Sequence, residues 1–144
     1  MNIARMKAPL DSDLMASFVA RVDEINALAD RSPGFVWRLK SADGGAALLV
    51  PYDDEGILVN FSVWESIEAL KDYAYRSAHA ELYRRRHEWF EQFDGAYSVR
   101  WWIPAGHVPT IDEATKRLEH LRTHGPSAYA FGFKSVHPPD AVQV

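Results

Sequence analysis

Histidine and tyrosine are the residue types in this chain best suited to moving protons, and one segment brings them together. His79 is followed four positions later by Tyr83 and is preceded at the same spacing by Tyr75. Residues four apart lie on one face of a continuous helix. A neutral imidazole beside a phenol can move protons for a bound enol or phenol, whereas a structural histidine would have its ring nitrogens hydrogen-bonded. His79 and Tyr83 are the candidate catalytic residues, and a structural role for His79 stays open.

Polar and aromatic side chains alternate along apolar segments that are typical of strands. Asn60 and Trp64 share one face of one segment, and Arg100 and Trp102 share one face of another. We expect Arg38 to join them from a third strand. Amide, guanidinium and indole groups suit the carbonyl or carboxylate and the ring of a small ligand. These five candidate ligand-binding residues also suit a subunit interface, and the two interpretations are compatible.

Metal, cofactor and nucleic-acid chemistry have little support in the sequence. The chain contains no Cys, which excludes thiolate ligands and disulfides. His120 and His124 lack a third ligand, and placement near a helix end explains them without a metal. The basic run 84–87 is spread around a helix, and the formal net charge of −4 does not attract phosphate backbones. We therefore expect no metal, no cofactor and no nucleic-acid partner.

Hydrophobic periodicity predicts strand, helix, strand, strand, helix, strand and then a further helix. Two helix starts have capping signals: Asp11-Ser12-Asp13 before the first helix, and Thr110 with Glu113 as a capping box before the last. The predicted strands are 2–7, 35–40, 57–64 and 97–103, and 41–56 is a hairpin-like excursion. The predicted helical regions are 14–31, 66–93 and 110–125, and the region 66–93 is either two helical stretches divided near Ser77 or one kinked helix.

This order is that of an α+β fold, the ferredoxin-like βαββαβ unit, here with an extra C-terminal helix. Helices are expected to cover the sheet face that carries Ile57, Val59 and Phe61. The opposite face, with Trp64 and Trp102, would be bare and would need a cover. A second copy of the chain is the expected cover, giving a homodimeric α+β barrel.

Length and hydropathy bound the remaining expectations. The 144 residues suit a single domain, which we place at 1–125, with 126–144 as a packing arm or a partly disordered tail. The sequence has no run of about 18 apolar residues and no apolar signal core at its start. A cytoplasmic protein with no membrane partner is expected.

Short motifs add a family resemblance. The segments 32–35, 63–70 and 77–79 resemble the dimeric α+β barrel superfamily that includes the antibiotic biosynthesis monooxygenases. The run 60–90, together with 101–107, is more similar still to a bacterial domain-of-unknown-function family placed beside them. The resemblance implies a homodimer with a small-molecule pocket. Some relatives oxidise aromatic polyketides without metal or flavin, and others degrade haem with an Asn, Trp and His set whose order and spacing differ here.

The sequence therefore predicts a dimeric barrel that binds a small hydrophobic or aromatic ligand. One hypothesis is a cofactor-independent monooxygenase that acts on aromatic or enolisable compounds. The other is a non-catalytic ligand-binding or dimerisation module. An enzyme needs converging polar groups around the ligand, whereas a module can fill the same space with its own aromatic side chains.

Overall fold

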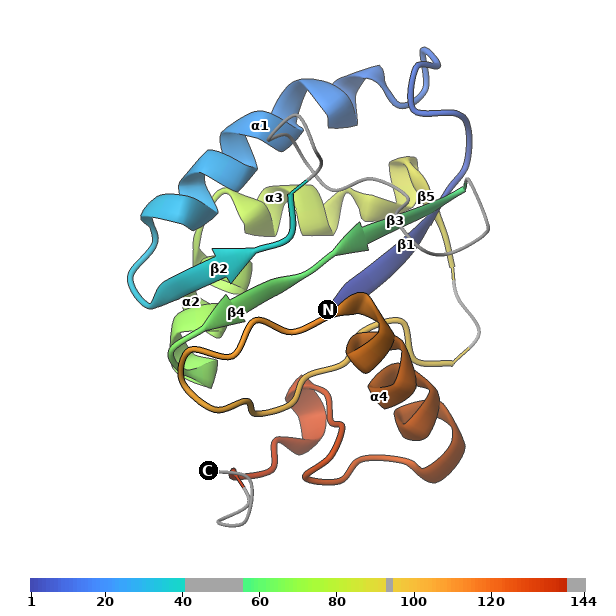
Figure 1. Ribbon diagram of the computed structural model, residues 1–144. Helices are drawn as coiled ribbons and strands as arrows, with labels where there is room; N and C mark the ends of the chain where they lie inside the picture. The colour runs from blue at the N-terminus through green and yellow to red at the C-terminus, as the bar shows by residue number, and fades with distance from the viewer. Residues whose placement is uncertain (41–55, 93–94, 140–144) are drawn as a thin grey trace. The chain divides into compact units, whose positions relative to one another are not determined.

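The computed structural model describes residues 1–40, 56–92 and 95–139 (Figure 1). Within them the chain is a mixed α+β protein with antiparallel strand pairs and four α-helices. The elements are β1 (Asn2–Met6), α1 (Ala16–Arg31), β2 (Phe35–Arg38), β3 (Ile57–Asn60), β4 (Ser62–Trp64), α2 (Ile67–Arg76), α3 (His79–Arg84), β5 (Phe90–Glu91) and α4 (Ile111–His124), with short 3-10 turns η1 (Arg86–Glu88) and η2 (Phe133–Ser135). The predicted hairpin at 41–56 lies almost entirely outside the described residues.

The chain forms two compact units. Unit 1 contains Met1–Ile3 and the chain from Phe93 onward, and unit 2 is Ala4–Gln92. The predicted boundary at residue 125 separates a domain from a C-terminal extension, and it does not coincide with the boundary between these two units. It stays a prediction.

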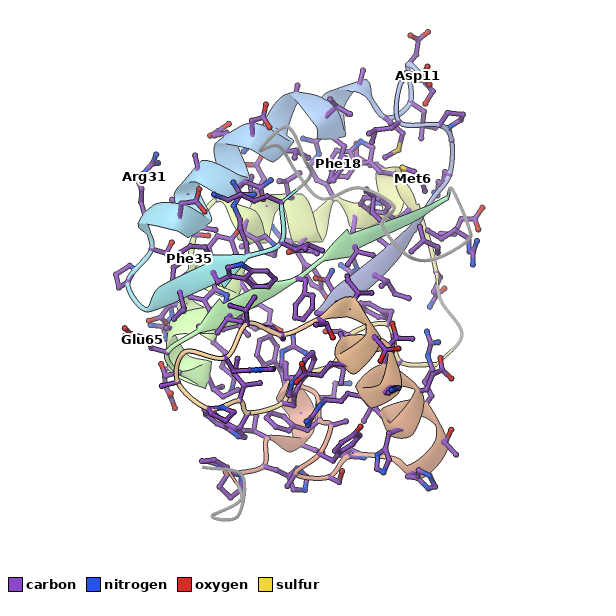
Figure 2. All side chains as sticks on the ribbon, in the orientation of Figure 1. Met6, Asp11, Phe18, Arg31, Phe35 and Glu65 are labelled. Atoms are coloured by element: carbon purple, nitrogen blue, oxygen red, sulfur yellow. The ribbon has the colours of Figure 1, made fainter. Side chains whose placement is uncertain are left out.

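The core of unit 2 lies where α1 and α3 meet the strands. Phe18 on α1 points toward Met6 on β1, as the labelled side chains show (Figure 2). The ring of Phe18 also contacts Trp89 at 5.5 Å and Phe90 at 5.1 Å between centroids. Burying each large apolar side chain stabilises the fold by roughly 1.5–3 kcal/mol. The buried members of this cluster are Met6, Met15, Ile25, Leu58, Leu82 and Trp89.

Helix α1 begins later than the sequence predicts. The predicted cap at Asp11-Ser12-Asp13 is wrong, because the residue before the helix is Met15 and no side chain caps the first turn. Met15 is completely buried in the unit 2 core. Burial of this side chain outweighs a capping bond, which contributes about 1 kcal/mol.

Strand β2 contains a bulge that reverses part of its predicted alternation. Phe35 pairs with Trp64 and Trp37 pairs with Val63. A step of two residues along β2 therefore corresponds to a step of one residue along β4. Such a bulge turns the following side chains to the opposite face. Phe35 therefore shares a face with Trp64, whereas the Trp37 ring contacts Phe61 on the other face at 5.5 Å between centroids. Simple alternation along the predicted strand 35–40 would put Phe35 and Trp37 on one face, and the bulge separates them.

The helices also cover the face that was predicted to be bare. Leu58 belongs to the core cluster formed with α1 and α3, and Trp64 stacks on Tyr73 of α2. The segment 57–64 is divided into β3 and β4 at Phe61. Ile57, Leu58 and Val59 are all buried, so alternation could not identify the helix side of this strand.

The predicted helical region 66–93 is broken near Ser77. Ser66 caps α2 by accepting a hydrogen bond from the Ala69 amide at 3.1 Å, as predicted. Ser77 ends α2, and its hydroxyl donates back to the Tyr73 carbonyl. Because α3 begins at His79, Tyr75 and His79 belong to different helices, and the single face predicted for them does not form.

Unit 1 is organised around α4. Its predicted capping box is present, since Thr110 accepts from the Glu113 amide and the Glu113 carboxylate accepts from the Thr110 amide. Ala114 and Leu118 on one face of the helix are buried. The predicted strand 97–103 is reduced to isolated bridges, one of which joins Arg100 to Phe131.

Candidate functional site

The candidate site in unit 2 is an aromatic row of Phe35, Trp64, Tyr73 and His79. The Trp64 and Tyr73 rings stack with centroids 5.0 Å apart and planes inclined by 25°. The His79 ring also contacts Tyr73, with centroids 4.9 Å apart. Phe35 meets Trp64 edge to face at 5.4 Å. Such offset and edge-to-face contacts are the preferred geometries of aromatic pairs.

Local structure explains how each member of the row reaches its place. The β2 bulge brings Phe35 to the face of Trp64, and the Ser66 cap starts α2 directly after β4, so that Tyr73 returns over the indole. The break at Ser77 then turns the chain, and the Ser77 hydroxyl accepts from the His79 amide at 3.2 Å. The row is therefore a product of the β4–α2–α3 connection.

Tyr73 is held as a neutral phenol in this row. Its hydroxyl donates to the Ile25 carbonyl of α1 at 3.3 Å. Burial raises the pKa of the Tyr73 phenol far above its ordinary value, although the nearby Arg38 charge partly opposes that rise. Tyr73 therefore acts as an aromatic wall and a hydrogen-bond donor.

The imidazole of His79 is held in a single neutral form. Its Nδ1 lies 3.1 Å from the Ala74 carbonyl oxygen. A carbonyl only accepts, so Nδ1 carries the hydrogen and Nε2 carries the lone pair. Burial lowers the pKa of the His79 imidazole, and the hydrogen bond with Ala74 opposes the effect in part. Nε2 makes no hydrogen bond with a residue of the described ranges, so its lone pair is available to accept a proton.

A polar group borders the row at β2 and β4. The Trp64 indole donates to the Ser62 hydroxyl at 2.9 Å. Arg38, paired opposite Ser62 in the strand register, forms an ion pair with Asp30 of α1 at 2.8 Å. The hydrogen bond from Arg38 lowers the pKa of Asp30 against the smaller opposing effect of burial. The guanidinium therefore has a carboxylate partner already, and a ligand anion would have to share it.

The predicted residues Asn60 and Tyr83 lie elsewhere on unit 2. Asn60 is the last residue of β3 and is exposed. Tyr83 lies on α3, where its ring meets Tyr75 edge to face at 6.4 Å and the Arg86 guanidinium at 4.2 Å. Of the seven predicted site residues, the structure brings Trp64, His79 and Arg38 together around Tyr73.

The predicted residues Arg100 and Trp102 belong to unit 1. The Arg100 guanidinium covers the Phe133 ring at 3.3 Å and donates to the Ser98 hydroxyl at 2.9 Å. The Trp102 indole donates to the His137 carbonyl at 2.8 Å. Both side chains therefore bind the segment 131–137 to the segment 98–102.

Tyr73, Ser62 and Asp30 were not among the predicted site residues. The period of α2 predicts Tyr73 as an apolar core position, and its hydroxyl gives it a second role. Two signals pointed toward it: it lies six residues before His79, and it follows a strand end occupied by Trp64. The β2 register that brings Asp30 and Ser62 close to the row has no local sequence signal.

Comparison with known families decides where the chain belongs. Its sequence matches the family described as "Domain of unknown function (DUF3291)" over residues 1–144. The chain belongs to the DUF3291 family. This DUF3291 chain matches neither a curated protein nor a solved structure. The predicted membership of an uncharacterised domain family is thus confirmed.

In residues 1–40, 56–92 and 95–139, no group of three or more His, Asp or Glu side chains is placed to hold a metal ion. None of the helices in those ranges has the length and apolar character needed to span a membrane.

Proposed function

We propose that this DUF3291 chain binds a small aromatic or enolisable compound at the aromatic row and that His79 removes a proton from it. The observation that carries the proposal is the fixed tautomer of His79. Its Nδ1–H is committed to the Ala74 carbonyl, so Nε2 is the basic atom of a neutral ring. A base that is neutral at the working pH is the first requirement of general base catalysis.

The composition of the row favours a flat ligand. Trp64 and Tyr73 already stack 5.0 Å apart, and stacking of this kind extends readily to a further ring. The Ser62 hydroxyl accepts from the Trp64 indole, so its own hydrogen remains to be donated to an oxygen atom of a ligand. An aromatic ketone or phenol fits both features.

The chemistry proposed is a monooxygenase reaction without a cofactor. Nε2 of His79 takes a proton from an activated CH2 group, and the resulting enolate supplies the electrons that reduce oxygen. One oxygen atom of O2 becomes the new carbonyl oxygen, and the other leaves as water with the two hydrogens of the CH2 group. The substrate is oxidised by O2 alone, which accounts for all atoms and electrons.

The strand order supports a ferredoxin-like unit as the frame for this site. β1 lies between β3 and β5, and β4 pairs with β2, while only Phe61 separates β3 from β4. If β3 and β4 are counted together as the third strand and β5 as the fourth, the first strand (β1) lies between the third and the fourth, and the second (β2) lies at an edge. That is the order of a ferredoxin-like βαββαβ unit, and we propose that two copies pair as an α+β barrel.

A non-catalytic ligand-binding or dimerisation module is the second candidate. The observation that favours it is the packing of His79, whose ring is in contact with Tyr73 and whose Nδ1 has a protein partner. In that case the imidazole stabilises the turn between α2 and α3 and transfers no proton. Ligand binding would then survive replacement of the ring nitrogen.

Oxygen consumption tests the catalytic proposal directly. Anthrone, which carries a CH2 group activated by a carbonyl and two rings, is the probe. We expect wild type to convert it to anthraquinone and His79→Gln to lose about 10²–10⁴-fold of the rate, the usual contribution of a general base. His87→Gln is the matched control, because His87 is an exposed histidine of η1 in the same unit.

Two outcomes separate the candidates. Equal oxygen uptake by wild type and His79→Gln would remove His79 from any catalytic role. Tight binding of anthrone to both proteins without oxygen uptake would support the non-catalytic module. Both variants should first be compared with wild type by thermal melting, so that loss of folding is not read as loss of activity.

A further inference from the structure

Glu113 of unit 1 is a carboxylate whose two oxygens are both occupied. Oε1 accepts from the Trp101 indole at 3.2 Å. Oε2 accepts from the Thr110 amide at 3.4 Å and lies 3.0 Å from Nε2 of His107. Burial alone would raise the pKa of Glu113, but hydrogen bonds from its imidazole, indole and backbone partners outweigh burial and lower that pKa. Glu113 is thus an anion at neutral pH.

The partner of this anion has a defined proton. An ionised carboxylate only accepts, so Nε2 of His107 carries the hydrogen that lies between them. In the neutral imidazole the lone pair is then on Nδ1. Nδ1 makes no hydrogen bond within the described residues, and 43% of the His107 side chain is exposed. The basic atom of His107 therefore has no hydrogen-bond partner among the described residues.

Helix capping does not account for this arrangement. The capping box of α4 requires only Thr110 and Glu113. The bonds from His107 and Trp101 to the same carboxylate are additional, and they leave Glu113 with only 22% of its side chain exposed. A carboxylate that orients an imidazole through one nitrogen leaves the other positioned for proton transfer.

From this geometry we propose that His107 is a general base at a second site in unit 1, oriented by Glu113. The ligand class is a small carbon or oxygen acid with a conjugated ring, because the indole of Trp101 borders the same carboxylate. Glu113 is the positioning residue: it fixes the tautomer of His107 and stabilises the imidazolium that forms on proton uptake.

The backbone and the charges around His107 keep its imidazole in place. The His107 amide donates to the Pro104 carbonyl at 3.1 Å, closing a turn in which Gly106 has a φ of +87°. Among the charged groups of α4, Asp112 is paired with Lys116 at 2.9 Å. Arg117, next to Trp101, lies over the ring and against the carbonyl of Tyr129. Glu113 is the charged group to which the described structure shows His107 hydrogen-bonded.

The probe is 5-nitrobenzisoxazole, an aromatic carbon acid that reports proton transfer by colour. Nδ1 of His107 takes the proton from C3, the electrons of that C–H bond form the nitrile, and the N–O bond breaks to release the phenolate. No oxidant or reductant is needed, since the reaction is an isomerisation with loss of one proton. Its rate measures base strength and orientation alone.

We expect the folded wild-type protein to accelerate this elimination. His107→Gln should lower the rate by roughly tenfold or more, consistent with loss of a general base. Glu113→Gln should lower the rate, because the ring of His107 loses the carboxylate that orients it through Nε2–H. If Glu113 were purely structural, the tautomer of His107, read by long-range nitrogen–proton NMR, would be the same in wild type and Glu113→Gln.

His124→Gln is the matched control, since His124 is an exposed histidine of the same unit whose ring contacts that of His120. The proposal is overturned if wild type and His107→Gln have equal rates, or if the rate is lost in His79→Gln instead. Long-range nitrogen–proton NMR gives an independent test that does not depend on turnover. A proton on Nδ1 of neutral His107, in place of Nε2, would equally contradict the assignment.

Discussion

The two candidate bases of this protein have opposite tautomers because their partners sit at opposite ring nitrogens. His79 gives its Nδ1–H to the Ala74 carbonyl, whereas His107 gives its Nε2–H to the Glu113 carboxylate. A carbonyl fixes a tautomer as a dipole, but a carboxylate also stabilises the protonated ring through its charge. His79 is therefore suited to remaining neutral, and the ring of His107 is oriented by an anion.

The neutral state of His79 predicts a particular dependence of stability on pH. Burial lowers the native-state pKa of His79 below the value of about 6.5 expected in the unfolded chain. The unfolded state then binds the proton more readily, so this contribution to the free energy of unfolding is complete above about pH 6.5. It is lost as the pH falls from there toward the native-state pKa, with a slope of at most about 1.4 kcal/mol per pH unit.

Urea unfolding at about pH 7.5, 6 and 5 measures how the free energy of unfolding changes with pH, and the slope can be compared with the value expected for uptake of one proton. His79→Gln should lose less stability than wild type over that interval, whatever its stability at the highest pH. His124→Gln, which changes an exposed histidine, should follow the wild-type slope. Parallel slopes for wild type and His79→Gln would mean that His79 does not titrate differently in the two states.

At the scale of elements, the connection between α1 and β2 depends on a close approach to α2. Gly34 has a φ of +83°, and a Cβ added there would lie 2.6 Å from the Cβ of Ala69. The Gly34 carbonyl also accepts from the Glu65 amide at 2.7 Å. The turn that ends α1 is thus packed directly on the first turn of α2, which places Tyr73 beside Trp64.

Gly34→Ala should therefore destabilise the protein by two separate effects. The positive φ costs about 1 kcal/mol for a residue with a Cβ, and the overlap with Ala69 adds about 1–3 kcal/mol. Gly125→Ala is the matched control, because Gly125 has a φ of +78° with nothing within 4 Å of the added atom. Thermal and urea unfolding of both variants measure the difference, and equal destabilisation would show that the overlap is relieved by a small shift of α2.

The elements that could be predicted from the sequence are those with local causes. The capping box at Thr110 and Glu113 and the cap at Ser66 are formed by residues within one helical turn, and both are present. The start of α1 directly after the buried Met15 and the bulge in β2 depend instead on partners far along the chain. Local sequence patterns cannot identify partners that are distant in the chain.

In the candidate site, too, some residues could be predicted from the local sequence and others could not. Trp64, His79 and Arg38 have side chains whose chemistry marks them in the sequence, and they meet around Tyr73. The helix side of β3 and β4 was predicted wrongly because Ile57, Leu58 and Val59 are all buried. The pairing between His107 and Glu113 was missed because the two residues lie six positions apart across a turn. That spacing matches neither the helical nor the strand period.

At the scale of the whole molecule, the strand order raises the question of what adjoins the sheet edge at β2. In the described residues β2 pairs with β4, and Val36 on β2 is 55% exposed. An exposed apolar residue on an edge strand favours association with another chain, and a charge there opposes it. The proposed barrel of two copies accounts for this residue.

Light scattering after gel filtration tests that association. We expect wild type to have twice the mass of one chain at about 10 μM, since an interface of typical size gives a stable pair. Val36→Glu should weaken pairing by tenfold or more, because the charge would be buried at the edge of β2. Val108→Glu is the control, as Val108 is 58% exposed and belongs to unit 1. A concentration of about 100 μM is well above the dissociation constants of specific protein–protein interfaces. A wild-type protein that stays monomeric at that concentration would exclude the barrel. The aromatic row would then be a site within one chain.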